Sequence, residues 1–271
     1  MRKMNSKASN EVEAWIISIG NELLIGKVVN TNFSWLAKQL TSMGYRVKRG
    51  ITVMDDFEEI SWAFKTALSA GADLIISTGG LGPTYDDKTS EALAYALSRA
   101  WEINEKALEI VKRKYELAGM EITEHRIKMA KLPEGAIPLE NPAGTAPGIM
   151  IKEGDSLIIS LPGVPKEMKA IFNNLMDELR ARTQLTVAET ELYISGVPES
   201  SIAPLIDEVV KKYPEVYVKS HPRGMELGVP LLLIHLSARA QKRDEALALV
   251  KKAEGLLLSL VKDVGGEATR K

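Results

Sequence analysis

In the first part of the chain, short apolar runs alternate with segments of helical period. Continuous apolar runs at residues 13–20, 45–53 and 72–76 predict buried strands. Apolar residues at three- and four-residue spacing predict a helix after each run, at residues 32–43, 60–68 and 88–100. The same spacing predicts a further helix at 102–118. The order βαβαβα with short connections predicts an α/β domain with a mainly parallel, three-layer sheet.

The pattern changes in the second half of the chain. It predicts a helix at 122–133, a short strand at 136–139, a hairpin at 149–160 and a helix at 166–182. Strands are then predicted at 189–195, 215–219 and 229–238, with helices at 199–212 and 242–261. This βαββα order predicts a second, small α+β domain. The expected boundaries are a disordered tip at 1–10, a first domain at 11–183, a second at 184–265 with a linker over 183–188, and a frayed tail at 266–271.

A glycine-rich turn, STGGLGPTYDD at 77–87, lies between a predicted strand and a predicted helix. Gly79, Gly80 and Gly82 lack a Cβ, so a ligand can approach the backbone, and backbone N–H groups at such a turn suit a phosphate. Asp86 and Asp87 follow at the predicted start of the helix, where carboxylates either cap the helix or hold a hard cation. A tight turn with an Asp cap is the simpler alternative.

Other polar loops also follow predicted strands. The loop 20–26 and the pair Asp55 and Asp56 each come directly after one. Because ligands of parallel sheets bind beyond the carboxyl ends of the strands, we expect these loops to meet the turn at 77–87. Glu22, in the first loop, is a candidate third acidic ligand, with a solvated loop acid as the alternative.

Composition narrows the possible functions. The 271-residue chain has a formal net charge of −1 and contains no cysteine, which excludes disulfides, thiol chemistry and cysteine–zinc sites. No polybasic stretch indicates a nucleic-acid or membrane partner, and the apolar run at 15–19 is too short for a signal or a membrane span. A cytoplasmic protein is therefore predicted. The four tryptophans are expected in the core of the first domain: Trp15, Trp35, Trp62 and Trp101.

Five motifs together resemble those of the CinA family (competence/damage-inducible protein A), whose first domain is similar to the molybdopterin-binding domain of MogA, MoaB, MoeA and gephyrin proteins. The matching segments are ISIGNELLIG (17–26), TGGLGPTYDDKT (78–89), KMAKLPEGA (128–136), NPAGTAPG (141–148) and LPGVPKEM (161–168). The resemblance implies a KH-like second domain. Full-length bacterial members carry a further nicotinamide-nucleotide amidase domain, and this chain is expected to stop before it.

The resemblance implies a metal-dependent hydrolase that cleaves ADP-ribose to AMP and ribose 5-phosphate. Asp87, with Asp55 or Asp56, would be catalytic, and Asp87, Asp86 and Glu22 would bind Mg²⁺, Mn²⁺ or Co²⁺, with K⁺ as a further candidate ion. Phosphate or nucleotide binding is implied for the loop residues that match the motifs: Gly20, Asn21, Glu22, Asn30, Thr78, Gly79, Gly80, Gly82, Pro83, Thr84, Asn141, Gly144, Thr145, Pro162 and Gly163.

Two alternatives of other classes stay open at this point. One is a molybdopterin-binding or adenylating protein of molybdenum cofactor biosynthesis, and the other is a non-catalytic nucleotide-binding protein or scaffold. The partner would be a small nucleotide or pterin phosphate in each of the ligand-binding cases. The resemblance also implies a homo-oligomer.

The second domain is predicted not to bind RNA. RNA-binding KH modules clamp backbone phosphates with a GxxG loop, and Gly196-Val-Pro-Glu199 stands where this loop would be. Titration with single-stranded RNA at physiological salt should give no nanomolar binding, and nanomolar binding would contradict this prediction.

Overall fold

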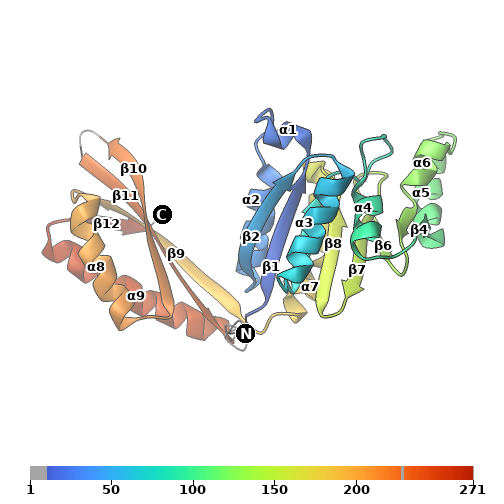
Figure 1. Cartoon of the computed structure of the whole chain (residues 1–271). Coiled ribbons are helices and arrows are strands. Elements are labelled where there is room, and N and C mark those ends of the chain that lie inside the picture. Colours follow the sequence, from blue (N-terminus) through green and yellow to red (C-terminus); the bar gives the residue numbers. More distant parts are fainter. Residues whose placement is uncertain (1–10, 227–228, 271) are drawn as a thin grey trace. The chain divides into compact units, whose positions relative to one another are not determined.

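The computed structural model describes residues 11–226 and 229–270, which form two units (Figure 1). The first unit comprises Val12–Thr41 and Tyr45–Arg182. The second comprises the chain from Thr183 onward together with Ser42–Gly44. The predicted disordered tip at 1–10 and the last residue, 271, lie outside the described residues.

The first unit is built on a six-stranded sheet of order β2-β1-β3-β8-β7-β6. The strands are β1 (Glu13–Ile19), β2 (Arg46–Val53), β3 (Leu74–Thr78), β6 (Ile137–Leu139), β7 (Gly148–Glu153) and β8 (Ser156–Leu161). The pairs β1–β2, β1–β3 and β3–β8 are parallel, whereas β7 pairs antiparallel with β6 and β8. The predicted α/β class with a mainly parallel sheet is therefore confirmed, and the carboxyl ends of β1, β3 and β8 lie side by side.

Helices cover both faces of this sheet. They are α1 (Asn21–Leu24), α2 (Thr31–Ser42), α3 (Phe57–Ser69), α4 (Thr89–Ala96), α5 (Glu105–Leu117), α6 (Glu124–Lys128) and α7 (Pro165–Ala181). Trp15 and Ile17 of β1 share a buried cluster with Phe64 of α3. Ile16 points to the opposite face and is equally buried, so a second helical layer is required there. In that layer α2 and α7 are in contact through Trp35 and Phe172, whose ring centroids lie 5.2 Å apart.

Three predicted helices are shorter in the structure: the helix predicted at 88–100 covers only Thr89–Ala96, and two others give way in part to strands. Trp101–Ile103 forms β4, which pairs with β5 (Lys131–Pro133), so α5 begins only at Glu105 and α6 ends at Lys128. Pro133 cannot continue a helix, and the strand pairing satisfies the backbone groups of both segments. The core placement of Trp62 was also wrong, because its side chain is 54% exposed.

The second unit has the order βαββαβ. Its elements are β9 (Thr186–Ser195), α8 (Glu199–Lys212), β10 (Val216–Glu226), β11 (Val229–Ala240), α9 (Arg243–Asp263) and β12 (Glu267–Arg270). The antiparallel sheet has the order β10-β11-β9-β12, and both helices share one buried cluster with it (Figure 1). This is a small α+β domain, as predicted. Its strand order is that of the split βαβ, or ferredoxin-like, motif, and the KH-like character of this domain stays a prediction.

Both ends of this unit differ from the predictions. The tail predicted as frayed forms β12, which pairs with Leu192–Ser195 of β9. Arg270 fastens this strand, because its guanidinium donates to both oxygens of the buried Glu254 carboxylate at 2.6 and 3.0 Å. At the other end β9 begins at Thr186, so the linker predicted at 183–188 is reduced to three residues.

The packing of α3 gives a matched test of the core. Phe64 is fully buried, whereas Trp62, on the same helix, is half exposed. Phe64→Ala should lower the free energy of unfolding by about 3–5 kcal/mol, because it leaves a cavity. Trp62→Ala should lower it by less, about 1–1.5 kcal/mol, since about half of the Trp62 side chain is already exposed. Urea unfolding checks both values, and equal losses in the two variants would contradict this account of the core.

Candidate functional site

The ends of four strands, β1, β2, β3 and β8, and the loops after them line one cavity of about 500 Å³, together with Met129 and part of the 141–148 loop. Its walls come from segments far apart in the sequence, as expected for the carboxyl edge of a parallel sheet. The lining residues are Ile19, Gly20, Glu22, Asp55, Gly79, Gly80, Leu81, Gly82, Pro83, Asp87, Met129, Thr145, Ala146, Pro162, Gly163, Val164 and Glu167. The loops that the sequence suggested would meet are therefore brought together.

Close packing requires glycine at Gly79 and Gly80, the first two glycines of the turn. Gly79 and Gly80 have φ values of 107° and 66°, which L side chains rarely adopt. A Cβ on Gly79 would lie 2.2 Å from the carbonyl oxygen of Ile19, and one on Gly80 would lie 2.3 Å from Thr89 Oγ1. The Thr89 hydroxyl also donates to the Gly79 carbonyl at 2.8 Å. The turn is thus fastened between the end of β1 and the start of α4.

Three backbone donors of the turn are unused. Among the described residues, the N–H groups of Gly80, Leu81 and Gly82 make no backbone or side-chain hydrogen bond. All three residues line the cavity. An array of fixed, unpaired backbone N–H groups is a feature that binds phosphate oxygens. The structure therefore leaves backbone donors free where the glycine pattern predicts a phosphate site, and phosphate binding there stays a prediction.

Asp86 and Asp87 do not cap the following helix. The N-terminal cap position of α4 is Lys88, and no side chain caps the helix there. Instead Asp87 Oδ2 accepts hydrogen bonds from the Thr84 N–H at 2.9 Å and from the Thr84 hydroxyl at 2.5 Å. The simpler interpretation, an Asp cap, is thus wrong, and Asp87 closes the turn at the cavity wall. Gly82 is needed here, because a Cβ would lie 2.6 Å from Asp87 Oδ2.

Thr84 also binds Asp86, whose Oδ1 lies 2.5 Å from the same hydroxyl. The hydroxyl has one proton, so it can donate to only one of the two carboxylates at a time. Hydrogen bonding from Thr84 lowers the pKa of Asp86 below its usual range. Asp86 does not line the cavity, whereas Asp87 does.

Asp55 and Asp56 have different roles in the structure. Asp56 is the N-cap of α3, and its Oδ1 accepts from the N–H groups of Glu58 and Glu59 at 2.9 and 3.2 Å. Asp55 lines the cavity and accepts from the Asn21 N–H at 2.8 Å. Of the two predicted alternatives, Asp55 is therefore the one placed for ligand chemistry, and Asp56 stabilises a helix.

The carboxylates from three loops repel one another at Asp55. Burial raises the pKa of Asp55, and the charges of Glu22, Asp86 and Asp87 raise it further, whereas the hydrogen bond from Asn21 lowers it. A site that raises the pKa of a carboxyl in this way also favours a bound cation, which would relieve the same repulsion.

Several predicted ligand residues shape the loops instead. Asn141 is fully buried. Its amide donates to Ala146 O at 2.9 Å and Glu167 Oε2 at 2.6 Å, and its Oδ1 accepts from the Ala143 N–H at 3.0 Å. Because these groups are occupied, Asn141 holds the 141–148 loop and is not placed to contact a ligand.

Asn30 and Thr78 line a separate, smaller cavity of about 90 Å³. Asn30 Oδ1 accepts from the Phe33 N–H at 2.9 Å at the start of α2, so its side chain is engaged there. Gly20 and Gly144 lie beneath acidic side chains, since a Cβ would come within 2.6 Å of Glu22 and 2.3 Å of Glu167. Thr145, Pro83, Pro162 and Gly163 line the main cavity as expected.

Glu167 is one cavity residue that no sequence argument selected. It lies in the first turn of α7, within the LPGVPKEM motif, and it lines the main cavity. Its position directly after a strand and a Gly/Pro turn was the available signal. With Glu22, Asp55 and Asp87 it brings the carboxylates around the cavity to four.

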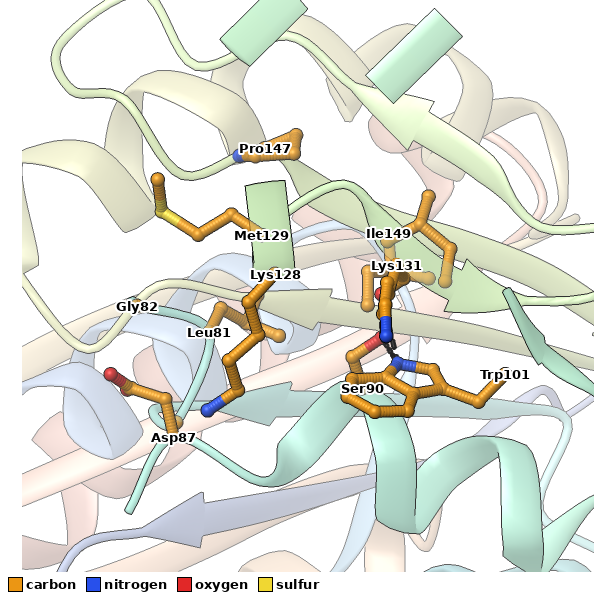
Figure 2. Close-up of a pocket in the computed structure, with 12 residues that line it drawn as sticks. Leu81, Gly82, Asp87, Ser90, Trp101, Lys128, Met129, Lys131, Pro147 and Ile149 are labelled. Atoms are coloured by element: carbon orange, nitrogen blue, oxygen red, sulfur yellow. Dashed lines mark hydrogen bonds between the residues drawn. The ribbon is translucent and has the colours of Figure 1, made fainter. Parts of the chain in front are cut away.

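Lys128 is the second residue that the sequence did not reveal. The side chain, at the end of α6, donates to Thr84 O and points toward Asp87 (Figure 2). It borders a small pocket that adjoins the main cavity and shares with it Gly80, Leu81, Gly82, Asp87 and Met129. Burial lowers the pKa of Lys128, and the nearby Asp87, Glu91 and Asp86 oppose that shift.

The predicted metal site is not assembled from protein groups alone. Within residues 11–226 and 229–270, no three His, Cys, Asp or Glu side chains are placed to hold a metal ion together. A divalent cation at Glu22, Asp86 and Asp87 thus stays a prediction, and it would need oxygen atoms from a ligand or water. In the part of the chain that the structure describes, no helix is long and apolar enough to cross a membrane.

Comparison with known proteins places these features in a family. The profile of a family described as "Probable molybdopterin binding domain" matches residues 15–181, which is more than half of the chain. A curated protein of Pyrobaculum arsenaticum is 51% identical over 255 residues, which cover 93% of this chain and 96% of the relative. A protein of Aeropyrum pernix is 48% identical over 257 residues, covering 93% and 95%. Neither name states an activity.

A solved structure is similar to the first part of the chain. It is the protein CinA, with unknown function, from Thermoplasma acidophilum, and it is 46% identical with a TM-score of 0.59. The match covers 62% of this chain and 98% of that one. The predicted resemblance to CinA and to molybdopterin-binding domains is therefore confirmed for this part of the chain.

The raised pKa of Asp55 gives a test of the cavity's electrostatics. Since the folded protein holds this proton more tightly than the unfolded chain, ionising Asp55 costs folding free energy at neutral pH. Below the unfolded pKa of about 3.9 both states are protonated and the cost vanishes. At pH 7, Asp55→Asn should therefore unfold at a higher urea concentration than the parent. At about pH 3 the two proteins should unfold at the same urea concentration.

Asp56→Asn is the matched control for this test. It keeps the cap on α3, because Asn caps as well as Asp, so we expect no gain in stability at either pH. If Asp55→Asn and the parent have the same urea midpoint at pH 7, the repulsion at Asp55 is not present as described.

Proposed function

Because the chain belongs to the molybdopterin-binding domain family, we propose that its main cavity binds molybdopterin or a closely related phosphorylated pterin. The observation that carries this proposal is the row of unpaired N–H groups at Gly80, Leu81 and Gly82 on the wall of the cavity. These residues lie within the segment that matches the family. They would hold the phosphate of the ligand, because fixed backbone donors need no rearrangement to bind an anion.

The size and position of the cavity support a ligand of this kind. Its volume of about 500 Å³ falls within the usual range of about 300–1,000 Å³ for small-molecule sites. Apolar side chains of Ile19, Leu81, Met129 and Val164 line it beside the polar groups. A flat heterocycle can lie against such walls while its phosphate stays at the glycine turn.

A divalent cation should accompany the ligand. A phosphate brings close to two negative charges into a cavity that already holds the carboxylates of Glu22, Asp55, Asp87 and Glu167. Burial raises the pKa of Asp55 most, the charges of Glu22, Asp86 and Asp87 raise it further, and a hard cation such as Mg²⁺ would relieve that repulsion. Asp55 and Asp87 are the residues that would hold it. When bound, the cation would neutralise charge, and phosphate and water oxygens would complete its shell.

Hydrolysis of ADP-ribose, predicted from the CinA resemblance, draws no support from the comparisons and stays a prediction. The same carboxylates would be needed for it, so binding and turnover must be measured on the same samples. The two readings differ in one outcome, which is whether a pyrophosphate-containing ligand is cleaved.

Calorimetry and product analysis test the proposal. The ligands are molybdopterin, neopterin monophosphate, AMP and ADP-ribose, each measured with and without Mg²⁺. We expect tighter binding of the pterin phosphates than of AMP, with Mg²⁺ required for full affinity. Preferred binding and Mg²⁺-dependent cleavage of ADP-ribose would favour the hydrolase instead. If none of the ligands binds, the proposed function is wrong.

Asp87→Asn tests the role of the cation. The amide oxygen can still accept from the Thr84 N–H, so the turn and the melting temperature should be preserved. Mg²⁺-dependent affinity should fall by about 10- to 100-fold, the scale of losing one support of a metal site. Asp86→Asn is the control, because Asp86 does not line the cavity and should leave affinity unchanged. Equal affinity in Asp87→Asn and the parent would contradict the assignment.

A further inference from the structure

The charges around the two adjoining cavities are unevenly distributed. The main cavity is lined by Glu22, Asp55, Asp87 and Glu167, and no Lys, Arg or His of the described chain lines it. The small pocket on the other side of the glycine turn is lined by Lys128 and Lys131, with Asp87 as its one carboxylate. The turn at Gly80–Gly82 therefore borders both an acidic cavity and a pocket in which lysines outnumber carboxylates.

The two lysines of the small pocket are engaged differently. Lys131 Nζ lies 4.9 Å from the centre of the Trp101 ring, so it is held in a cation–π contact away from the turn. Trp101 is itself fixed, because its indole N–H lies 3.2 Å from Ser90 Oγ and 3.0 Å from Lys131 O (Figure 2). Lys128 instead reaches the turn, where it donates to Thr84 O beside Asp87.

The ammonium group of Lys128 has donors to spare. It carries three N–H groups, and a single hydrogen bond, to Thr84 O, is formed with the described residues. The small pocket has a volume of about 10 Å³, which is room for about one water molecule and too little for a phosphate. This space lets the end of a flexible lysine turn from Thr84 O toward Gly82 without a change in the backbone.

We propose that Lys128 binds the phosphate of the ligand from the far side of the glycine turn, together with the N–H groups of Gly80, Leu81 and Gly82. This assignment rests on the proposed function and deepens it, because it names the side chain that supplies positive charge to an anion in an otherwise acidic site. Lys128 would exchange its bond to Thr84 O for one to a phosphate oxygen. The heterocycle of the ligand would then extend into the main cavity.

This arrangement resolves a difficulty of charge. Neutral N–H groups alone would have to hold a phosphate against four carboxylates, and a cation at Asp55 and Asp87 acts from the acidic side only. A lysine on the opposite side of Gly82 places positive charge on both sides of the phosphate. Charge-assisted hydrogen bonds to phosphate are about twice as strong as neutral ones, so one such contact has a measurable effect on affinity.

The experiment uses a matched pair of ligands, neopterin monophosphate and neopterin, which differ only in the phosphate. Calorimetry at fixed Mg²⁺ compares the parent with Lys128→Gln, Lys128→Arg and Lys131→Gln. We expect Lys128→Gln to weaken neopterin monophosphate binding by about 10-fold or more, the usual scale for a lost hydrogen bond between charged groups. Its affinity for neopterin should stay within about twofold of the parent, and this also shows that the variant is folded.

The other variants separate a ligand contact from a structural role. Lys128→Arg keeps the charge and should therefore weaken binding of the phosphate less than Lys128→Gln does. Lys131→Gln removes a charge from the same pocket but should leave the affinity unchanged, because Lys131 lies over Trp101. The deficit of Lys128→Gln should shrink as salt rises, since the interaction is electrostatic.

The possible failures are distinguishable. If the parent binds neopterin monophosphate and Lys128→Gln binds it equally well, the role of Lys128 is overturned while the proposed function stands. An equal loss of affinity for both ligands in Lys128→Gln would also overturn it, because the lysine would then act on the fold. If the parent binds none of the phosphates, both proposals are wrong.

Discussion

The close contact of Gly79 with the end of β1 is the constraint on which the site depends. The backbone of Gly79 passes between two strand ends, with its N–H donating to Leu161 O at 3.0 Å and its Cα against the carbonyl of Ile19. Gly163 also packs against Gly79, because a Cβ added to Gly163 would lie 3.4 Å from Gly79 Cα. These contacts set the register of three loops at once. Any side chain at residue 79 would separate them, so the unpaired donors at Gly80–Gly82 are a consequence of packing in the sheet.

Around this rigid turn the protein places more negative charge than folding alone would favour. Asp55 is held near the carboxylates of Glu22 and Asp87 although burial already raises its pKa. Natural proteins keep such unfavourable arrangements mainly at functional sites, where a ligand or cation relieves them. The same reasoning separates Asp55 from Asp56. Asp56 satisfies two backbone donors of α3 and needs no ligand to explain its position.

The fold of the first unit and the location of the site could be predicted because both depend on local patterns. Apolar runs marked β1, β2 and β3, and the glycines marked a turn that must approach other groups closely. Features set by contacts between distant segments could not be predicted in this way. The pairing of β4 with β5 shortened two expected helices, and β12 formed where the sequence pattern suggested a frayed end. Asn141 matched a motif, yet the hydrogen bonds of its side chain are all within the loop or to Glu167. Lys128 begins the KMAKLPEGA motif, yet nothing in its own neighbourhood shows that it meets Thr84, 44 residues away in sequence.

The central claim is that the unpaired N–H groups of the glycine turn bind a phosphate at the edge of an acidic, cation-dependent cavity. A crystal structure of the protein with neopterin monophosphate and Mn²⁺, with the metal located by its anomalous scattering, tests it most directly. We expect phosphate oxygens within hydrogen-bond distance of the N–H groups of Gly80–Gly82. We also expect a metal peak between the phosphate and the carboxylates of Asp55 and Asp87. A ligand phosphate bound elsewhere, with the N–H groups of the turn still unpaired, would contradict the central claim.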